Sequence, residues 1–171
     1  MTRTPARGGG GRDGRDGFVP KGNARYDRHD TYYRKAKKEG FAARSVYKLD
    51  ELDHEFRLIK PSARVLDLGC APGSWLQYVD AKLKAGTAIG IDLLPVKAGV
   101  SGKVAVLQGD AFTTALEDKG PFDVVLSDMA PNTTGIRDVD ASRSLALCER
   151  ALEVAERARK PGGNLCVKIL E

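Results

Sequence analysis

The chain has 171 residues, 42 % of them hydrophobic, and a formal net charge of +5. This length favours a single domain with one buried core, and the sequence has neither an apolar run long enough to cross a membrane nor the apolar segment of a secretion signal. The three cysteines, Cys70, Cys148 and Cys166, are odd in number and lack metal-ligand spacing, which argues against a disulfide framework and a zinc site. We therefore expect a cytoplasmic protein without a metal centre or membrane span, and we expect it to act as a monomer.

The positive charge is concentrated near the start of the chain. Residues 1–48 contain thirteen Lys or Arg against five acids, a net charge of +8, so the remaining residues carry −3. A basic segment on a mildly acidic body is typical of proteins that bind polyanions. Residues 1–24 are rich in Gly and Arg, and we predict a disordered tail there. We assign residues 25–171 to one folded domain, of which residues 25–60 form a basic RNA-binding arm and a helix.

Aromatic and basic side chains alternate within the arm, between residues 26 and 41. Cations suit the phosphates of a nucleic acid, and rings between them can stack on unpaired bases. The segment therefore favours binding of single-stranded RNA. The aromatic residues are Tyr26, Tyr32, Tyr33 and Phe41, and the basic ones are Arg28, His29, Arg34, Lys35, Lys37 and Lys38.

Apolar residues recur at helical spacing between residues 45 and 59, which predicts an amphipathic helix. Lys48 lies beside this apolar stripe, near the start of the helix. It is either an ordinary exposed lysine or a cation turned toward a cleft at the end of a following sheet. The stripe consists of Val46, Leu49, Leu52 and Phe56.

The segment 64–75, Arg-Val-Leu-Asp-Leu-Gly-Cys-Ala-Pro-Gly-Ser-Trp, predicts a strand, a tight turn and the start of a helix. The apolar run ends at Leu68, and two glycines and a proline separate it from a helical pattern that begins at Ser74. Because glycine has no Cβ and the first N–H groups of a helix lack partners, such a turn lets the backbone approach a ligand closely.

Strands and helices alternate through the rest of the chain. This pattern predicts an α/β fold with a doubly wound, mostly parallel sheet, whose ligands lie at the carboxyl ends of the strands. Further strands are predicted at 87–92, 104–107, 122–126 and 164–170, and helices at 75–83, 113–118 and 141–159, the last with Leu145, Cys148, Leu152 and Ala155 on one face. The residues at or near strand ends are Gly73, Asp92, Asp110, Asp128 and Lys168.

The turn at 69–73 favours one class of cofactor over another. A dinucleotide fingerprint needs a middle glycine to admit the pyrophosphate, and this chain has Ala71 at that place. A cofactor with ribose, adenine and an amino acid, such as S-adenosylmethionine, fits better. Asp92 would accept from its ribose hydroxyls and Asp110 from the adenine amino group, directly or through water, with Trp75 packed nearby. The alternative for each acid is an ordinary turn residue.

The segment 127–132, Ser-Asp-Met-Ala-Pro-Asn, points to the atom that is methylated. Enzymes that methylate base nitrogens tend to place an aromatic ring here, which holds the planar amino group. Because this chain has no such ring, a sugar hydroxyl of RNA is the expected target.

Methylation of a hydroxyl requires that the proton leave as the oxygen attacks. Lys168 lies within the apolar run 165–170, where a charge is costly unless it has a partner. We expect Lys168 to be the general base, or the group that orients and stabilises the forming alkoxide, with Asp128 and Lys48 in support. The alternative is an edge-strand lysine that extends into water.

From residue 26 to residue 171 the chain resembles the FtsJ/RrmJ-like (RlmE) ribosomal RNA 2′-O-methyltransferases. The resemblance implies a class I methyltransferase fold that uses S-adenosylmethionine. It also implies that the partner is the assembled or assembling large ribosomal subunit, in which a uridine ribose of the large-subunit (23S) rRNA is methylated. The segments that carry it are 32–49, 67–75, 92–95, 108–110, 127–132 and 167–168.

The family carries a catalytic Lys-Asp-Lys-Glu tetrad, and by motif Lys48, Asp128 and Lys168 match its first three members. The family glutamate lies on a later strand, and Glu171 falls in the wrong place to substitute, so we expect a domain truncated after its fifth strand. Two other functions stay open: 2′-O-methylation of a tRNA anticodon loop, and a non-catalytic assembly factor that binds RNA or the cofactor. The expected cofactor-binding residues are Gly69, Gly73, Trp75, Asp92, Asp110 and Asp128.

Overall fold

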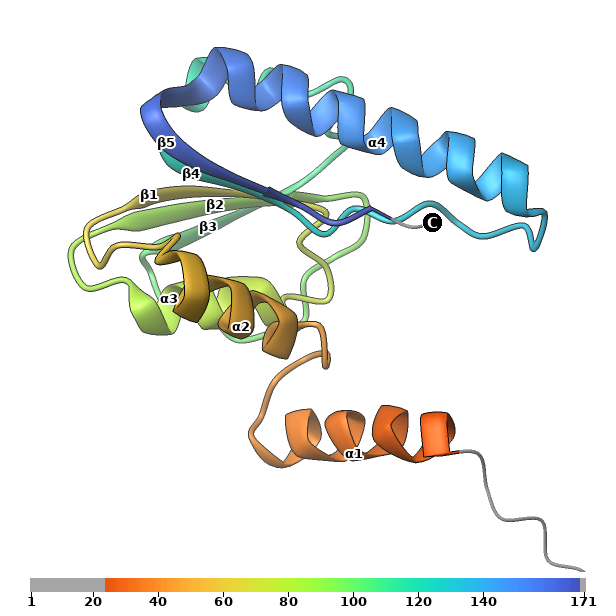
Figure 1. Cartoon of the computed structure of the whole chain (residues 1–171). Coiled ribbons are helices and arrows are strands. Elements are labelled where there is room, and N and C mark those ends of the chain that lie inside the picture. The colour runs from red at the N-terminus through yellow and green to blue at the C-terminus, as the bar shows by residue number, and fades with distance from the viewer. Residues whose placement is uncertain (1–23, 170–171) are drawn as a thin grey trace, which may run out of the picture.

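The structure is a computed structural model that describes residues 24–169. Its centre is a five-stranded sheet in the order β3-β2-β1-β4-β5, in which every neighbouring pair of strands is parallel (Figure 1). The chain begins in the middle of the sheet, runs outward to one edge, and returns to continue toward the other. The predicted doubly wound sheet is thus confirmed, with its switch point between β1 and β4. The strands are β1 (Arg64–Leu68), β2 (Thr87–Asp92), β3 (Val104–Gln108), β4 (Phe122–Ser127) and β5 (Arg159–Val167).

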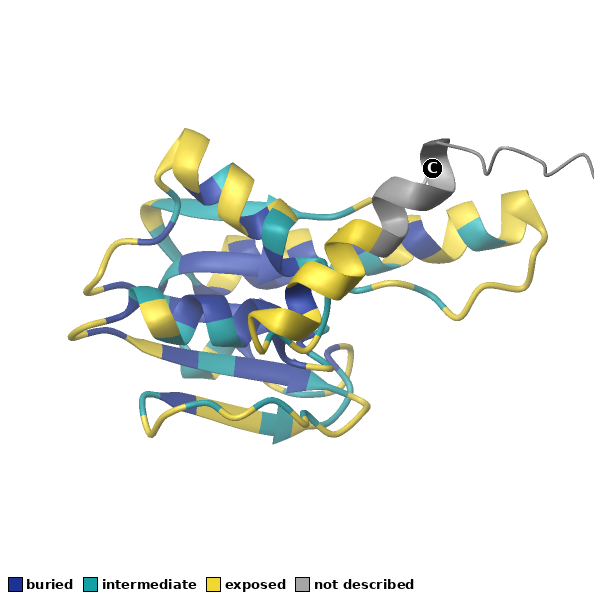
Figure 2. Cartoon of the chain, turned by 90° about the horizontal axis from the view of Figure 1, so that it is seen from below, coloured by how far each residue is buried: buried dark blue, intermediate teal, exposed yellow. Residues whose placement is uncertain are grey.

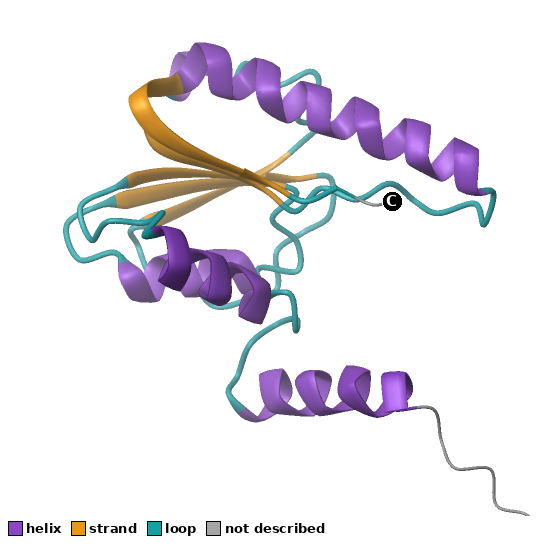
Figure 3. Ribbon diagram, in the orientation of Figure 1, coloured by secondary structure: helices purple, strands orange, loops and turns teal. Residues whose placement is uncertain are grey.

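Helices cover both faces of the sheet (Figure 3). Helices α2 and α3 lie on one face and α4 lies on the other, while α1 lies apart, beyond α2. No helix among residues 24–169 is long and apolar enough to cross a membrane. The helices are α1 (Ala24–Lys38), α2 (Val46–Phe56), α3 (Ser74–Lys82) and α4 (Arg137–Ala158), with a short 3-10 turn, η1 (Glu117–Lys119).

The central strands divide the core into two layers. Alternate residues of β1 point to opposite faces, so Val65 packs with α2 and α3, whereas Leu66 and Leu68 pack with α4. Figure 2 shows that burial is concentrated in these central strands and on the helix faces turned toward them. A strand buried on both faces requires a nearly continuous apolar sequence, which is what β1 has apart from Asp67.

The apolar faces predicted for two helices are only partly buried. Phe56 is 59 % exposed because Arg57 takes a left-handed conformation that ends α2 there. Leu145 and Leu152 are also exposed. Helix α4 instead packs through small side chains, which allow it to lie close to the sheet. Its buried residues are Ser144, Cys148, Ala151, Val154, Ala155 and Ala158.

Three element boundaries also differ from the prediction. The helix expected at 113–118 is reduced to η1, because the backbone N–H groups of residues 113 and 114 close a turn on the Asp110 carbonyl. Helix α4 begins at Arg137, four residues early, and carries acids in its first turn, where the helix dipole favours them. Strand β5 includes the Pro161-Gly162-Gly163 segment, which interrupts its regular pairing with β4. The strand ends at Val167, so Lys168 directly follows it instead of lying inside it.

Residues 1–23 of the expected disordered tail and Glu171 lie outside the described residues, so what was expected of them stays a prediction. Ala24, the last residue assigned to the tail, is instead the first residue of α1.

Candidate active site

A pocket of about 400 Å³ opens at the carboxyl ends of β1 to β4. Four of the predicted site residues, Gly69, Asp92, Asp110 and Asp128, line it. These residues are separated by up to 59 positions in sequence and meet because the parallel strands end at one edge of the sheet. The structure also adds apolar residues that the sequence analysis did not name. They are Leu93, Leu94, Phe112, Met129 and Leu147.

Asp92 and Asp110 hold the loops around this pocket. The two carboxylate oxygens of Asp92 accept hydrogen bonds from the backbone N–H of Ala71 at 2.9 Å and of Leu94 at 2.8 Å. Asp110 accepts from the N–H of Phe112 at 2.8 Å. Both acids are therefore turn residues, as the alternative interpretation stated, and both also line the pocket. A carboxylate oxygen has two lone pairs, so these bonds leave capacity for a ligand.

The glycines of the turn are required by close packing. Gly69 has φ +75°, and a Cβ there would lie 2.7 Å from the Met129 side chain. Gly73 has φ +114°, and a Cβ there would lie 2.5 Å from the Cβ of Ala98. Because Gly73 has no Cβ, the loop after β2 can pack directly against the turn. The side of Gly73 that lacks the Cβ faces this loop and not the pocket.

Trp75 is a core residue beneath the turn. Its ring is buried among the side chains that α2 and α3 bring to the sheet, and its Nε1 donates to the Ser45 carbonyl at 3.0 Å. The residues that line the pocket include neither Trp75 nor Gly73. The structure therefore places these two expected cofactor residues beside the pocket. Trp75 fixes the start of α3 against the start of α2, and Gly73 packs against the loop after β2.

Lys168 and Asp128 form the ion pair that the sequence analysis expected. Nζ of Lys168 donates to the Asp128 carboxylate, and the two side chains are 38 % and 16 % exposed. Both backbones are tied to the sheet, because the Lys168 N–H donates to Ser127 at 2.9 Å and the Asp128 N–H donates to Leu68 at 3.1 Å. Asp128 forms part of the pocket wall, and Lys168, which is not among the lining residues, contacts Asp128 from beside the pocket.

Lys48 lies on a neighbouring surface. Its Nζ is 3.2 Å from a carboxylate oxygen of Glu51, and its side chain is 63 % exposed. Burial raises the pKa of the Cys166 thiol, the Asp128 and Asp67 charges raise it further, and Lys48 opposes them. Among the described residues, the ion pair of Lys48 is with Glu51, whereas that of Lys168 is with Asp128.

Asp67 is the site residue that sequence reasoning missed. It is fully buried in the middle of β1, and neither of its carboxylate oxygens has a hydrogen-bond partner. Burial raises its pKa well above the usual range, and the nearby charges of Asp128 and Asp92 add to the shift. The signal was present in the sequence, because an acid inside an apolar strand is as costly as the lysine that drew attention at position 168.

The charge of this site suits a cationic ligand. Asp92, Asp110 and Asp128 line the pocket, and Lys168 is paired with Asp128. Asp67 is buried behind this wall, where the charges of Asp128 and Asp92 help to raise its pKa. A methyl donor that carries an ammonium and a sulfonium group would meet these charges, and the orphaned Asp67 could gain a partner from it. Within residues 24–169, no three His, Cys, Asp or Glu side chains are placed to hold a metal ion.

Comparison with known proteins identifies the family. A sequence model of the FtsJ-like methyltransferases matches residues 41–171. The chain belongs to the FtsJ-like methyltransferase family. Its fold and the pocket at its strand ends are thus those of an enzyme that takes a methyl group from a donor.

Individual relatives of this FtsJ-like methyltransferase support the assignment. The chain is 50 % identical over 147 residues to the ribosomal RNA large subunit methyltransferase E of Desulfatibacillum aliphaticivorans, covering 83 % of this chain and 71 % of that one. It is 47 % identical over 152 residues to the protein of the same name in Syntrophobacter fumaroxidans, covering 85 % and 77 %. A crystal structure of a ribosomal RNA methyltransferase from Plasmodium falciparum superposes with a TM-score of 0.66 at 28 % identity, covering 75 % of this chain and 78 % of that one.

Proposed function

We propose that this FtsJ-like methyltransferase uses S-adenosylmethionine to methylate the 2′-hydroxyl of a uridine ribose in large-subunit (23S) rRNA. The observation that carries the proposal is the Lys168–Asp128 ion pair, in which Asp128 belongs to the wall of a pocket that Asp92 and Asp110 also line. The partner is the assembled or assembling large ribosomal subunit in the cytoplasm. Relatives at about half identity are named for methylation of this RNA, which supports the substrate class.

The residues of the pocket fit the parts of the donor. Asp92 would accept from the ribose hydroxyls and Asp110 from the adenine amino group, with the half-exposed ring of Phe112 beside it. Asp67 and Asp128 would face the cationic amino-acid end. The bound donor supplies a methyl group made electrophilic by its positively charged sulfur.

Lys168 would handle the proton. As the bond between the ribose oxygen and the methyl carbon forms, the carbon–sulfur bond breaks with its electron pair going to sulfur. The hydroxyl proton must leave at the same time. We assign Lys168 either to accept this proton at Nζ as the general base, or to orient the hydroxyl and stabilise the forming alkoxide while solvent takes the proton. Asp128 holds Nζ in position and stabilises its ammonium form.

A sugar hydroxyl fits this site better than a base. After Asp128 the wall of the pocket continues with Met129 and Ala130, and neither side chain offers a flat face against which a base could be held. The chemistry of a hydroxyl needs a proton acceptor and a line of attack, and the ion pair supplies the first.

The test is methyl transfer from tritiated S-adenosylmethionine to large ribosomal subunits from cells that lack the modification. We expect incorporation at one uridine 2′-hydroxyl, and we expect Lys168→Ala to reduce kcat by about a thousandfold, the scale of general acid–base catalysis. Lys84→Ala, which alters an exposed lysine at the opposite end of the sheet, is the matched control. Incorporation into tRNA instead would favour an anticodon-loop enzyme, and RNA binding without incorporation would favour an assembly factor.

A further inference from the structure

A second pocket lies between α1, the linker that follows it, and α2. Its volume is about 580 Å³, within the range of sites that bind small organic ligands. It is separate from the pocket at the carboxyl ends of β1 to β4, and the two share no lining residue. We call that first pocket the donor pocket, because the proposed function places the methyl donor in it. We call the second one the α1–α2 pocket. Its lining residues are Tyr32, Lys35, Arg44, Ser45, Tyr47, Lys48, Asp50 and Glu51.

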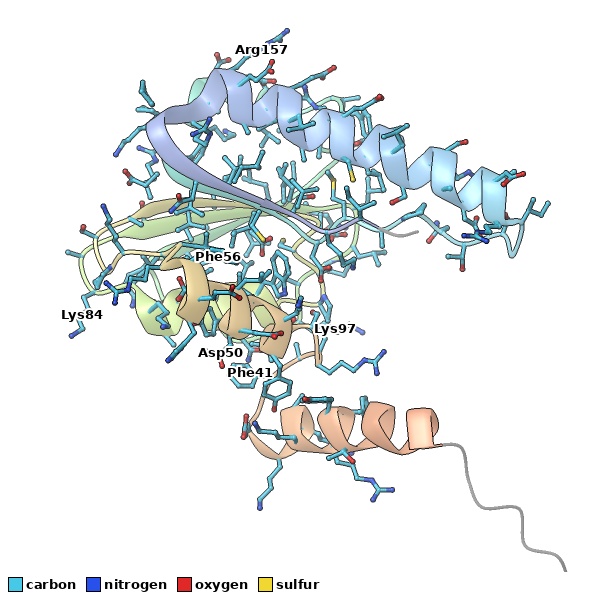
Figure 4. The ribbon with its side chains drawn as sticks, in the orientation of Figure 1. Phe41, Asp50, Phe56, Lys84, Lys97 and Arg157 are labelled. Atoms are coloured by element: carbon cyan, nitrogen blue, oxygen red, sulfur yellow. The ribbon has the colours of Figure 1, made fainter. Side chains whose placement is uncertain are left out.

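The ring of Tyr47 lines the α1–α2 pocket and is held in place by contacts on several sides. The Tyr47 hydroxyl donates to Glu39 at 2.8 Å, and Nζ of Lys35 lies 4.5 Å from the ring centroid. Phe41 meets the same ring edge to face at 6.3 Å and lies between α1 and α2 (Figure 4). Partial burial and the Glu39 carboxylate raise the pKa of Tyr47 to about 12, so its hydroxyl remains a donor at neutral pH.

Tyr32 supplies a second ring that is open to solvent. Its centroid lies 5.6 Å from that of Tyr47, with the two planes tilted by 45°, and half of the residue is exposed. A ring backed by another ring on one side and open on the other is a surface on which a flat base can stack. Such stacking is tolerant of base identity because every base has a π-face.

The charges of the α1–α2 pocket differ between its walls. Lys35 on α1, 4.0 Å from Glu39, and Arg44 in the linker are cationic. On α2, Lys48 is paired with Glu51 at 3.2 Å, which leaves Asp50 as the uncompensated charge of that wall among the lining residues. A phosphate would be drawn to the cationic wall and repelled by Asp50, while carboxylates can accept hydrogen bonds from the polar edge of a base. This arrangement distinguishes the two ends of a nucleotide.

Lys48, which the sequence analysis placed in support of Lys168, lines the α1–α2 pocket. An RNA strand bound here would therefore pass beside a residue expected to support methyl transfer.

We propose that the α1–α2 pocket binds a single unpaired nucleotide of the substrate RNA that neighbours the methylated one, with its base on Tyr32 and its phosphate at Lys35 and Arg44. This inference rests on the proposed function, because it takes RNA as the substrate. It adds a site that holds the strand while a neighbouring ribose occupies the mouth of the donor pocket.

The test compares Tyr32→Ala, Tyr32→Phe and Phe56→Ala in the full chain. Phe56 is the matched control because it is an exposed ring at the end of α2 away from α1 (Figure 4). The measurements are the Kd for a short single-stranded oligouridine, the KM and kcat with large ribosomal subunits, and the affinity for S-adenosylmethionine as a check on folding.

We expect Tyr32→Ala to raise the oligouridine Kd and the subunit KM about tenfold, with kcat and donor affinity unchanged. Tyr32→Phe keeps the ring and should stay within about twofold of the original chain, as should Phe56→Ala. The inference is overturned if Tyr32→Ala binds oligouridine as well as Phe56→Ala does, or if the original chain binds none. If the original chain methylates no RNA while oligouridine binding still depends on Tyr32, the proposed reaction fails and the nucleotide site stands.

Discussion

Asp53 and Asp67 are both buried on the face of the sheet that α2 and α3 cover, but only the carboxylate of Asp53 has hydrogen-bond partners. Asp53 accepts hydrogen bonds from the Ile59 N–H at 2.8 Å and the Tyr78 hydroxyl at 2.9 Å, and Lys82 lies 3.1 Å away. Asp67 has no hydrogen-bond partner at either oxygen. The carboxylate of Asp53 lies between α2, α3 and the loop after α2. The carboxylate of Asp67 lies in β1, close enough to Asp92 and Asp128 of the pocket wall for their charges to raise its pKa.

The contrast separates a part of the molecule that is built for stability from a part that is built to bind. Burial alone would raise the pKa of Asp53, but its backbone and side-chain hydrogen bonds outweigh burial and hold the pKa below its usual value. Nothing offsets burial at Asp67, and its pKa is raised. Burying the Asp67 carboxylate without a hydrogen-bond partner costs free energy in the ligand-free protein. Such a cost is expected in a binding site where the ligand supplies the missing partner.

Replacing the satisfied acid should have the larger effect on stability. Asp53→Asn removes the negative charge that three donors surround, and we expect it to lower the free energy of unfolding by about 3 kcal/mol at pH 7. Because the folded-state pKa is depressed, this stabilisation is present above pH 4 or so and is lost as the pH falls through the folded-state value. Urea unfolding at pH 7 and pH 3 measures both effects.

Glu55→Gln, an exposed acid on the same helix, is the control for Asp53→Asn and should change stability by less than about 0.5 kcal/mol. Equal stabilities for the two variants at pH 7 would mean that the hydrogen bonds of Asp53 contribute nothing net.

Replacing the orphaned acid should have a smaller effect of opposite sign. We expect Asp67→Asn to raise the free energy of unfolding of the ligand-free protein by about 1–3 kcal/mol at pH 8. Because the folded-state pKa of Asp67 is raised, its penalty is absent below about pH 4 and grows as the pH rises toward the folded-state value. The difference from the original chain should therefore be near zero at pH 4, whereas Asp118→Asn, an exposed control, should show no such trend. A gain that is the same at both pH values would contradict this account.

The two aspartates also show what the sequence could and could not reveal. The order of strands and helices followed from apolar periodicity, and the meeting of Asp92, Asp110 and Asp128 followed from the rule that parallel strands present their carboxyl ends together. The pairing of Lys168 with Asp128 could be expected because a charge beside apolar residues needs a partner.

Other features depended on contacts that no local pattern records. Trp75 was expected near the cofactor, but its ring is held in the core by a bond to the Ser45 carbonyl, thirty positions away. Phe56 fitted the helical stripe, yet the backbone reverses at Arg57 before the ring can be covered. Asp53 carries no sequence signal of burial, because its partners come from α3 and from the loop after α2.

The smallest expected effect tests whether the cost at Asp67 serves the donor. If the donor's cationic end supplies the missing partner, Asp67→Asn should weaken binding of S-adenosylmethionine about tenfold while it stabilises the free protein. Isothermal titration in two buffers of different ionisation enthalpy tests the same point in a second way. A cation bound beside Asp67 should lower its raised pKa, so donor binding should be accompanied by proton release in the original chain and not in the asparagine variant. Asp118→Asn should keep both the affinity and the proton release of the original chain. If Asp67→Asn bound S-adenosylmethionine with the same affinity and the same proton release as the original chain, the Asp67 carboxylate would have no part in donor binding. Its contrast with Asp53 would then concern the fold alone.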